Sequence, residues 1–203
     1  MDAYITHFLI GAIPAALVFS CFYPYRCRAL KAQELRSGLW REAALVVFVM
    51  CIFGLAAMVL WPGYHWEESD GLWGNLVIHN ARQSIQDHLN LIPFRMIRDY
   101  WGAFQTGDLF YAIVFLFGNL GTFLPLGFFP ALLFRNRKAK HILFIGGGFS
   151  LTAEILQFFL GRHCDVDDVI LNVLGAFCGY WLFLLLRRLF PGYLQRFQCS
   201  EMK

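Results

Sequence analysis

Five long apolar stretches constrain this chain more than any other feature of its sequence. Each one is long enough to cross a hydrocarbon core of about 30 Å as a helix of about 20 residues. They cover approximately residues 5–23, 43–61, 109–134, 142–160 and 169–186. Only 15% of the 203 residues are charged, whereas soluble domains carry about 25%. The sequence therefore predicts an all-α, polytopic membrane helical bundle with about five transmembrane helices.

Basic residues between the apolar stretches indicate how the helices are oriented. Arginine and lysine concentrate between the first two stretches, between the third and the fourth, and in the C-terminal tail. By the positive-inside rule these segments face the cytoplasm. The chain opens Met1-Asp2 rather than with basic residues, so we interpret the first stretch as a retained helix and not as a signal peptide. This predicts a multi-pass protein of the cell membrane with its N-terminus outside and its C-terminus in the cytoplasm.

Composition also excludes several classes of protein. A net charge of +3 is too small to indicate nucleic-acid binding. The six cysteines follow neither metal-ligand nor disulfide spacing. Because no repeat or soluble linker interrupts the chain, we expect a single membrane domain over residues 1–203. No cofactor is expected, and the oligomeric state stays open.

The longest connection, residues 62–108, is predicted to be structured. Ala81, Ile85, Leu89 and Ile92 recur at helical spacing, which places them on one face. Tryptophan and tyrosine flank this segment, as they do at membrane interfaces. We therefore expect an amphipathic outer helix from about residue 75 to 99. It would lie along the outer membrane surface or pack over the bundle as a lid.

Polar side chains within or beside three of the spans are the strongest functional signal, because hydrocarbon penalises them. They are Asn119 in the third span, Glu154 and Gln157 in the fourth, Asp165, Asp168 and Asn172 leading into the fifth, and Arg162 in the turn between the last two. Their spacing places those of each helix on one face. Since the fourth span runs outward and the fifth returns, both polar faces fall in the outer half. The sequence therefore predicts an outer polar pocket in which Arg162 keeps a carboxylate ionised.

Structural explanations of the same residues stay open beside this one. Asp165, Asp167 or Asp168 could cap the fifth helix. The amides of Asn119, Gln157 and Asn172 could serve only as interhelical hydrogen bonds, worth about 0.6 kcal/mol each, and Glu154 and Arg162 could form a purely structural ion pair. Residues 163–165 suggest zinc, but adjacent side chains on a short turn seldom converge on one ion, so no metal is expected.

Three sequence blocks together resemble the VanZ-like family, which is named after a teicoplanin-resistance protein. They are LNLIPF at residues 89–94, GN at 118–119 with FLPLG at 123–127, and EILQ at 154–157 followed by GR at 161–162, DVDD at 165–168, Asn172 and Gly175. Gly121-Thr122 departs from the bulky apolar residues usual there. The resemblance covers about residues 89–179, and we place the motif-bearing part of the domain at about 75–190. It implies a cell-envelope protein connected with antibiotic resistance, names no reaction, and adds Asn90 to the candidate ligand-binding residues.

Two functions from different classes remain. The first is a non-enzymatic accessory protein whose pocket binds membrane lipids, a lipid-linked cell-wall precursor or a lipoglycopeptide. The second is an enzyme acting on an envelope lipid, with Glu154 as general base and Asp168 or Asp165 as its partner or metal ligand. The chain lacks GxSxG and HExxH motifs, so we favour the binder. Transport is a third and weaker alternative, because no repeat is visible.

The predicted topology can be tested by a cysteine-accessibility scan in intact cells. Single cysteines near Lys138 and in the C-terminal tail should be protected from a membrane-impermeant reagent, because both segments are predicted to be cytoplasmic. A cysteine at the start of the chain is the positive control and should react. Labelling of Lys138 and of the tail from outside would contradict the topology.

Overall fold

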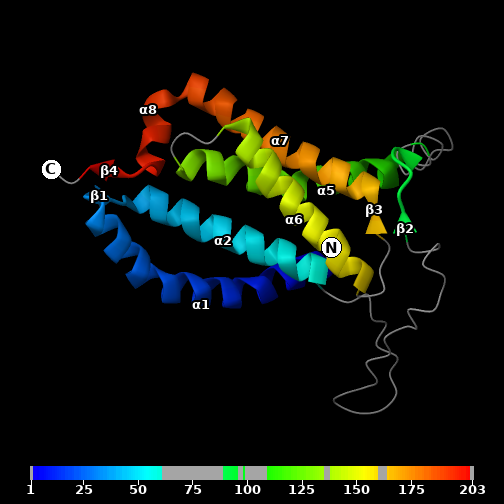
Figure 1. The fold of residues 1–203 in the computed structure, drawn as a ribbon, viewed down its shortest axis with the longest axis horizontal. Helices are drawn as coiled ribbons and strands as arrows, with labels where there is room; N and C mark the ends of the chain where they lie inside the picture. Colours follow the sequence, from blue (N-terminus) through cyan, green and yellow to red (C-terminus); the bar gives the residue numbers. More distant parts are fainter. Residues whose placement is uncertain are drawn as a thin grey trace, which may run out of the picture.

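A computed structural model describes residues 2–60, 89–95, 98, 109–134, 138–159 and 164–201. Arg162 and most of the expected outer helix lie outside the described residues. Figure 1 shows the elements, which are α1 (Asp2–Ala32), β1 (Leu35–Arg36), α2 (Leu39–Leu60), β2 (Leu89–Asn90), α5 (Leu109–Leu133), α6 (Ala139–Phe159), β3 (Cys164–Asp165), α7 (Val166–Leu189), α8 (Pro191–Leu194), the 3-10 helix η1 (Gln195–Phe197) and β4 (Ser200–Glu201). The structure is thus overwhelmingly helical, as the sequence predicts.

Four of the described helices, α2, α5, α6 and α7, are long and apolar enough to cross a membrane. They contain the last four predicted spans, and the protein is therefore a multi-pass membrane protein. The first predicted span lies within α1, a helix of 31 residues that is less apolar than α2. Its length suffices for a crossing, and the crossing itself stays a prediction.

Two very short sheets lie at opposite ends of the helical bundle (Figure 1). At one end β1 pairs antiparallel with β4, so that Leu35 lies opposite Glu201. At the other end β2 pairs in parallel with β3, so that Asn90 lies opposite Asp165. We call these the basic end and the acidic end, after the charged residues beside each sheet. The α1–α2 connection and the tail share the basic end, as the five-span order requires.

Helix α1 is joined to α2 near the basic end. The guanidinium of Arg26 forms an ion pair with the carboxylate of Glu42 and lies 5.6 Å from the ring centres of Phe19 and Tyr23. Arg41 is buried and donates to the hydroxyl of Ser37 at 3.2 Å. The ion pair of Arg26 with Glu42 holds the two helices together where apolar packing alone gives little preference in a membrane.

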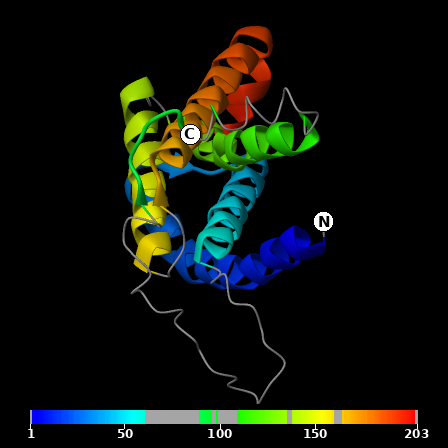
Figure 2. The ribbon, with the colours of Figure 1, turned by 90° about the vertical axis from the view of Figure 1, so that its right-hand side faces the viewer.

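Helices α5 and α7 lie side by side in both views (Figures 1 and 2) and approach each other closely. Glycines make this approach possible. A Cβ atom on Gly127 would lie 1.6 Å from the carbonyl oxygen of Ala176, and one on Gly179 would lie 2.0 Å from that of Leu124. Gly175 meets Leu120 in the same way. Close backbone contact across small residues is the usual basis of helix association in membranes.

Residues 89–94 differ from the expected helix, whereas Arg95 and Arg98 are helical. Leu89 and Asn90 form strand β2, and a turn follows. Pro93 disfavours helical backbone at the residue before it, and pairing with β3 supplies hydrogen bonds to the backbone of Leu89 and Asn90. The helical stripe therefore does not continue through Leu89, and its other part, at Ala81 and Ile85, lies outside the described residues.

The glycine contact predicts a contrast between two positions on α5. Gly127→Ala should lower the melting temperature in detergent by several degrees, because the new methyl group meets the backbone of α7 and overpacking costs about 1–3 kcal/mol. Gly121→Ala is the matched control, because a Cβ there meets nothing within 4 Å. It should leave the melting temperature unchanged or raise it slightly. Equal melting temperatures would show that the close α5–α7 contact does not limit stability.

Candidate functional site

The acidic end gathers four carboxylates, which we call the acidic cluster: Glu154, Asp165, Asp167 and Asp168. Glu154 comes from α6, Asp165 from β3, and the other two from the first turn of α7. Glu154 is 3% exposed and Asp167 is 0% exposed. Burying carboxylates is unfavourable unless donors surround them, so the partners of each one show what the cluster is built to do.

Asp165 links three elements at once. Its Oδ1 accepts the backbone N–H of Asp167 at 2.8 Å and so caps α7. Its Oδ2 accepts the side-chain amide of Asn90 at 2.8 Å, and its own backbone N–H donates to Oε2 of Glu154 at 3.1 Å. The cap predicted for one of the three aspartates is therefore formed by Asp165. A cap of this kind stabilises a helix by about 1 kcal/mol.

Asp167 and Asn90 fix residues 89–95, which we call the strap, to β3 and the first turn of α7. Oδ1 of Asp167 accepts the backbone N–H of Phe94 at 2.5 Å. Phe94 has a φ of 65°, which is uncommon for a bulky residue. The side-chain oxygen of Asn90 accepts the backbone N–H of Ile92 at 3.3 Å and shapes the turn. The strap is thus held by side chains at both of its ends.

Amide side chains from α5 and α7 extend the polar contacts into the bundle. Asn119 donates to Oδ1 of Asp168 at 3.0 Å and so joins α5 to α7. Asn172 donates to the hydroxyl of Ser150 at 3.0 Å, while its buried Oδ1 has no partner among the described residues. Gln157 is half-buried on α6, one turn from Glu154. Asn119 and Asn172 thus make the interhelical hydrogen bonds that amides in membrane helices commonly make.

Glu154 is placed differently from the aspartates. Besides the backbone N–H of Asp165, its carboxylate faces the thiol of Cys164 and the like-charged groups of Asp165 and Asp168. A charge in this position is more costly than an amide would be. Arg162, which the sequence suggests as its partner, lies outside the described residues.

Cys164 lies beside these carboxylates but is poorly suited to nucleophilic chemistry. Burial raises the pKa of its thiol, and the negative charges of Glu154, Asp165 and Asp168 raise it further. The thiol is therefore protonated near neutral pH, whereas nucleophiles and metal ligands are thiolates. Across the part of the chain that is described, no three His, Cys, Asp or Glu side chains are grouped so as to hold a metal ion.

The structure brings together most of the residues singled out from the sequence. Asn90, Asp165 and Glu154 form one connected set, and Asn119 joins Asp168 beside it. Asn172 is bonded to Ser150, which sequence reasoning missed although it lies four residues before Glu154 on the same helix face. The role of Phe94 rests on its backbone N–H, for which no side-chain pattern exists. That these residues bind a ligand stays a prediction.

Comparison with known families adds an identification to this geometry. A family model described as VanZ/LLP1 matches residues 45–187, which include the whole acidic cluster and the strap. The chain belongs to the VanZ/LLP1 family. The resemblance inferred from the three sequence blocks is thereby confirmed. The VanZ/LLP1 match begins within α2, so α1 lies outside it. No curated protein and no solved structure matches the chain.

The strap predicts a difference between two neighbouring residues. Asn90→Ala should destabilise the protein by about 1–3 kcal/mol, because Oδ2 of Asp165 loses its donor. The rate of amide hydrogen exchange at Ile92 and Phe94 should rise in the same variant, because the strap is held less firmly. Leu91→Ala is the control, since Leu91 is exposed and such changes stay within about 0.5 kcal/mol. Unchanged exchange at Phe94 in Asn90→Ala would mean that Asp167 alone holds the strap.

Proposed function

We propose that this VanZ/LLP1 membrane protein is a non-enzymatic accessory protein of the cell envelope. In this proposal the acidic cluster binds the polar head group of a lipid-linked cell-wall precursor or of a lipoglycopeptide. Family membership and four membrane-spanning helices support the class of protein. The observation that carries the proposed site is the carboxylate of Glu154, 3% exposed within a membrane span. Ionisable groups in such positions usually mark a binding or transport site.

Structural hydrogen bonds explain why the aspartates are present, but they do not explain why residue 154 carries a charge. Asp165 caps α7 and anchors Asn90, and Asp167 anchors Phe94. The hydrogen bonds to Glu154 come from the backbone N–H of Asp165 and the thiol of Cys164, and the carbonyl oxygen of a glutamine can accept from either donor. If the residue served only to join α6 to β3, an amide would do so at a lower desolvation cost.

The chemistry of the cluster favours a ligand that donates hydrogen bonds. Ionised carboxylates are acceptors only, so they select hydroxyl, amide or ammonium groups. Sugar and peptide head groups carry such donors. The proposal also requires the acidic end to face the outside of the cell. The concentration of arginine and lysine at the opposite end supports that orientation.

The test compares Glu154→Gln with a structural control on the same helix. Glu154→Gln keeps the shape and removes the charge, so it should abolish protection of cells against a lipoglycopeptide while its melting temperature in detergent stays near that of the wild type. Ser150→Ala leaves the charge of Glu154 in place and removes the hydroxyl that accepts the side-chain N–H of Asn172. It should lower stability by about 1–3 kcal/mol and reduce protection only to that extent.

Two outcomes would contradict this function. Wild-type protection by a stably inserted Glu154→Gln protein would show that the charge is not used. Parallel losses of stability and protection in both variants would return Glu154 to a structural role. The purified protein should also be incubated with labelled envelope lipid, with and without a divalent metal ion. Recovery of unchanged lipid supports a binder, whereas turnover would favour the enzyme in which Glu154 acts as general base.

A further inference from the structure

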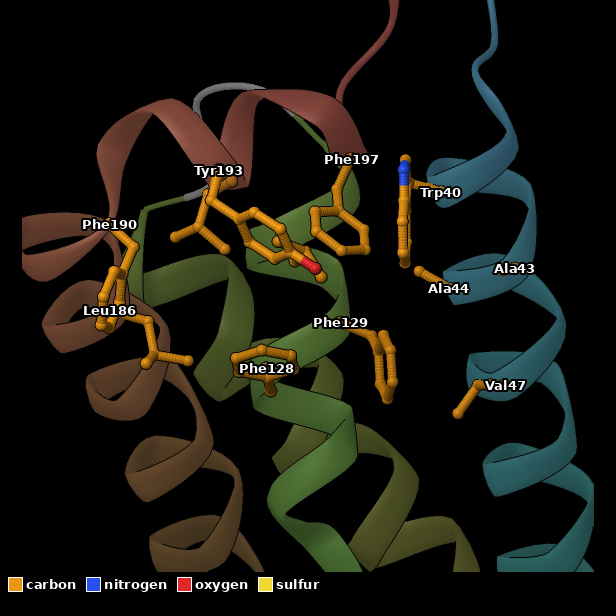
Figure 3. A pocket seen from close by; sticks show the side chains of 12 residues that line it. Trp40, Ala43, Ala44, Val47, Phe128, Phe129, Leu186, Phe190, Tyr193 and Phe197 are labelled. Atoms are coloured by element: carbon orange, nitrogen blue, oxygen red, sulfur yellow. The ribbon is translucent and has the colours of Figure 1, made fainter.

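An apolar groove lies at the basic end of the bundle, between α2, α5 and the C-terminal end of α7 with the residues that follow it (Figure 3). Its volume is about 450 Å³, within the range of about 300–1,000 Å³ that is usual for ligand pockets. Every side chain that lines it is apolar or aromatic: Trp40, Ala43, Ala44, Val47, Phe128, Phe129, Leu132, Leu186, Phe190, Tyr193, Leu194 and Phe197. The groove is therefore a separate feature from the site proposed above.

Three parts of the chain build the groove, and they leave it open. Figure 3 shows Phe128 and Phe129 of α5 between α2, which carries Val47, and the end of α7. At the end nearest the tail, the ring of Trp40 lies 6.2 Å from that of Tyr193 and 6.1 Å from that of Phe197. Val47 nevertheless remains 47% exposed, and Phe190 is also exposed. The walls are thus packed, while the groove itself is not filled by the described chain.

Basic residues adjoin this apolar surface. The guanidinium of Arg196 lies 5.4 Å from the ring centre of Tyr193. Arg187 and Arg188 are exposed in the last turn of α7, beside Leu186. Buried Arg41 follows Trp40, and its Nε has no partner among the described residues. The neighbouring Glu42 is already paired with Arg26 and does not neutralise the rim.

We propose that this groove binds an acyl chain of an anionic phospholipid from the membrane leaflet at the basic end, with the lipid phosphate beside Arg196. An acyl chain matches a wall of apolar and aromatic side chains, and a phosphate matches the guanidinium of Arg196 beside that wall. Basic pockets between transmembrane helices commonly hold anionic lipid head groups in this way. The tyrosine and tryptophan rings lie where such side chains prefer to be, between hydrocarbon and head group.

The dimensions of the groove argue against a second protein helix as its occupant. On α2 and α5 its lining covers only residues 40–47 and 128–132, which is about two helical turns at most, and residues 186–197 form the remaining wall. A transmembrane helix needs contact along a much greater length, since about 20 residues cross the hydrocarbon core. A single acyl chain that enters from the leaflet needs no more than this short stretch.

The experiment uses the full chain in lipid nanodiscs with photoactivatable phosphatidylglycerol or phosphatidylcholine that carries the reactive group on the acyl chain. Peptides containing groove residues should be labelled by the phosphatidylglycerol probe, and excess unlabelled phosphatidylglycerol should compete. Val47→Trp should reduce this labelling at least about fivefold by filling the groove. Leu185→Trp is the control, because Leu185 is an exposed residue of α7 outside the lining, and should leave labelling unchanged.

The charge of the rim is tested separately. Arg196→Gln should reduce the preference for phosphatidylglycerol over phosphatidylcholine about fivefold, the effect expected for one arginine near a lipid surface. Arg28→Gln removes an exposed charge of α1 that is not part of the groove, and should leave the preference unchanged. Glu154→Gln should change neither the labelling nor the lipid preference. The proposal for the groove and the proposal for the acidic cluster can therefore be contradicted independently of each other.

Several results would overturn the proposal. Equal labelling by both phospholipids would show that the arginines do not select the lipid. Equal effects of Val47→Trp and Leu185→Trp on labelling would show that the lipid does not bind in the groove. Cross-links from a second copy of the chain to groove residues, lost in Val47→Trp, would make the groove a protein interface. If Val47→Trp does not insert into the membrane, the wild-type protein supplies the test through competition by unlabelled phosphatidylglycerol. Labelling that this competitor does not reduce would contradict the proposal.

Discussion

The hydrogen bonds made by Asp165 hold the acidic end together. One oxygen of this carboxylate begins α7, the other holds the strap through Asn90, and the backbone N–H of the same residue reaches Glu154. In a medium of low polarity each of these bonds is strong, and a missing partner is correspondingly costly. The position of Glu154 relative to α7 and the strap is therefore set by one residue in a two-residue strand.

The close contact of α5 with α7 places the remaining polar group. Gly175 lies against the backbone of Leu120, the residue next to Asn119. Because the two helices touch there, the short side chain of Asn119 reaches Asp168 directly. The small residues and the polar residues of α7 thus act together: the glycines bring the helices close, and the amide and carboxylate fix their register. A bulkier interface would separate Asn119 from its partner.

Much of this arrangement could be predicted from the sequence because hydrocarbon imposes strict rules. Apolar length located α2, α5, α6 and α7 to within a few residues of their ends, and helical spacing placed Glu154 and Asp168 on facing surfaces. The strap could not be predicted in this way. The stripe through Leu89 indicates a helix, whereas the structure has a strand there, because pairing with Cys164 and Asp165 depends on residues distant in sequence. The hydroxyl of Ser150 was overlooked because serine in a membrane helix commonly bonds to its own backbone.

The pairing of β1 with β4 has a consequence for biosynthesis. Arg36 precedes α2, whereas its partner Ser200 follows α7, so the two are synthesised before and after the helices between them. The pairing therefore cannot form until Ser200 has left the ribosome, after all the intervening helices have been synthesised. Tyr193 and Phe197 precede Ser200 by only a few residues, so the groove is also completed late. In the lipid-binding proposal, this order means that α2, α5 and α7 can meet bilayer lipid before the wall of Tyr193 and Phe197 is added, so the groove closes around hydrocarbon rather than admitting it later.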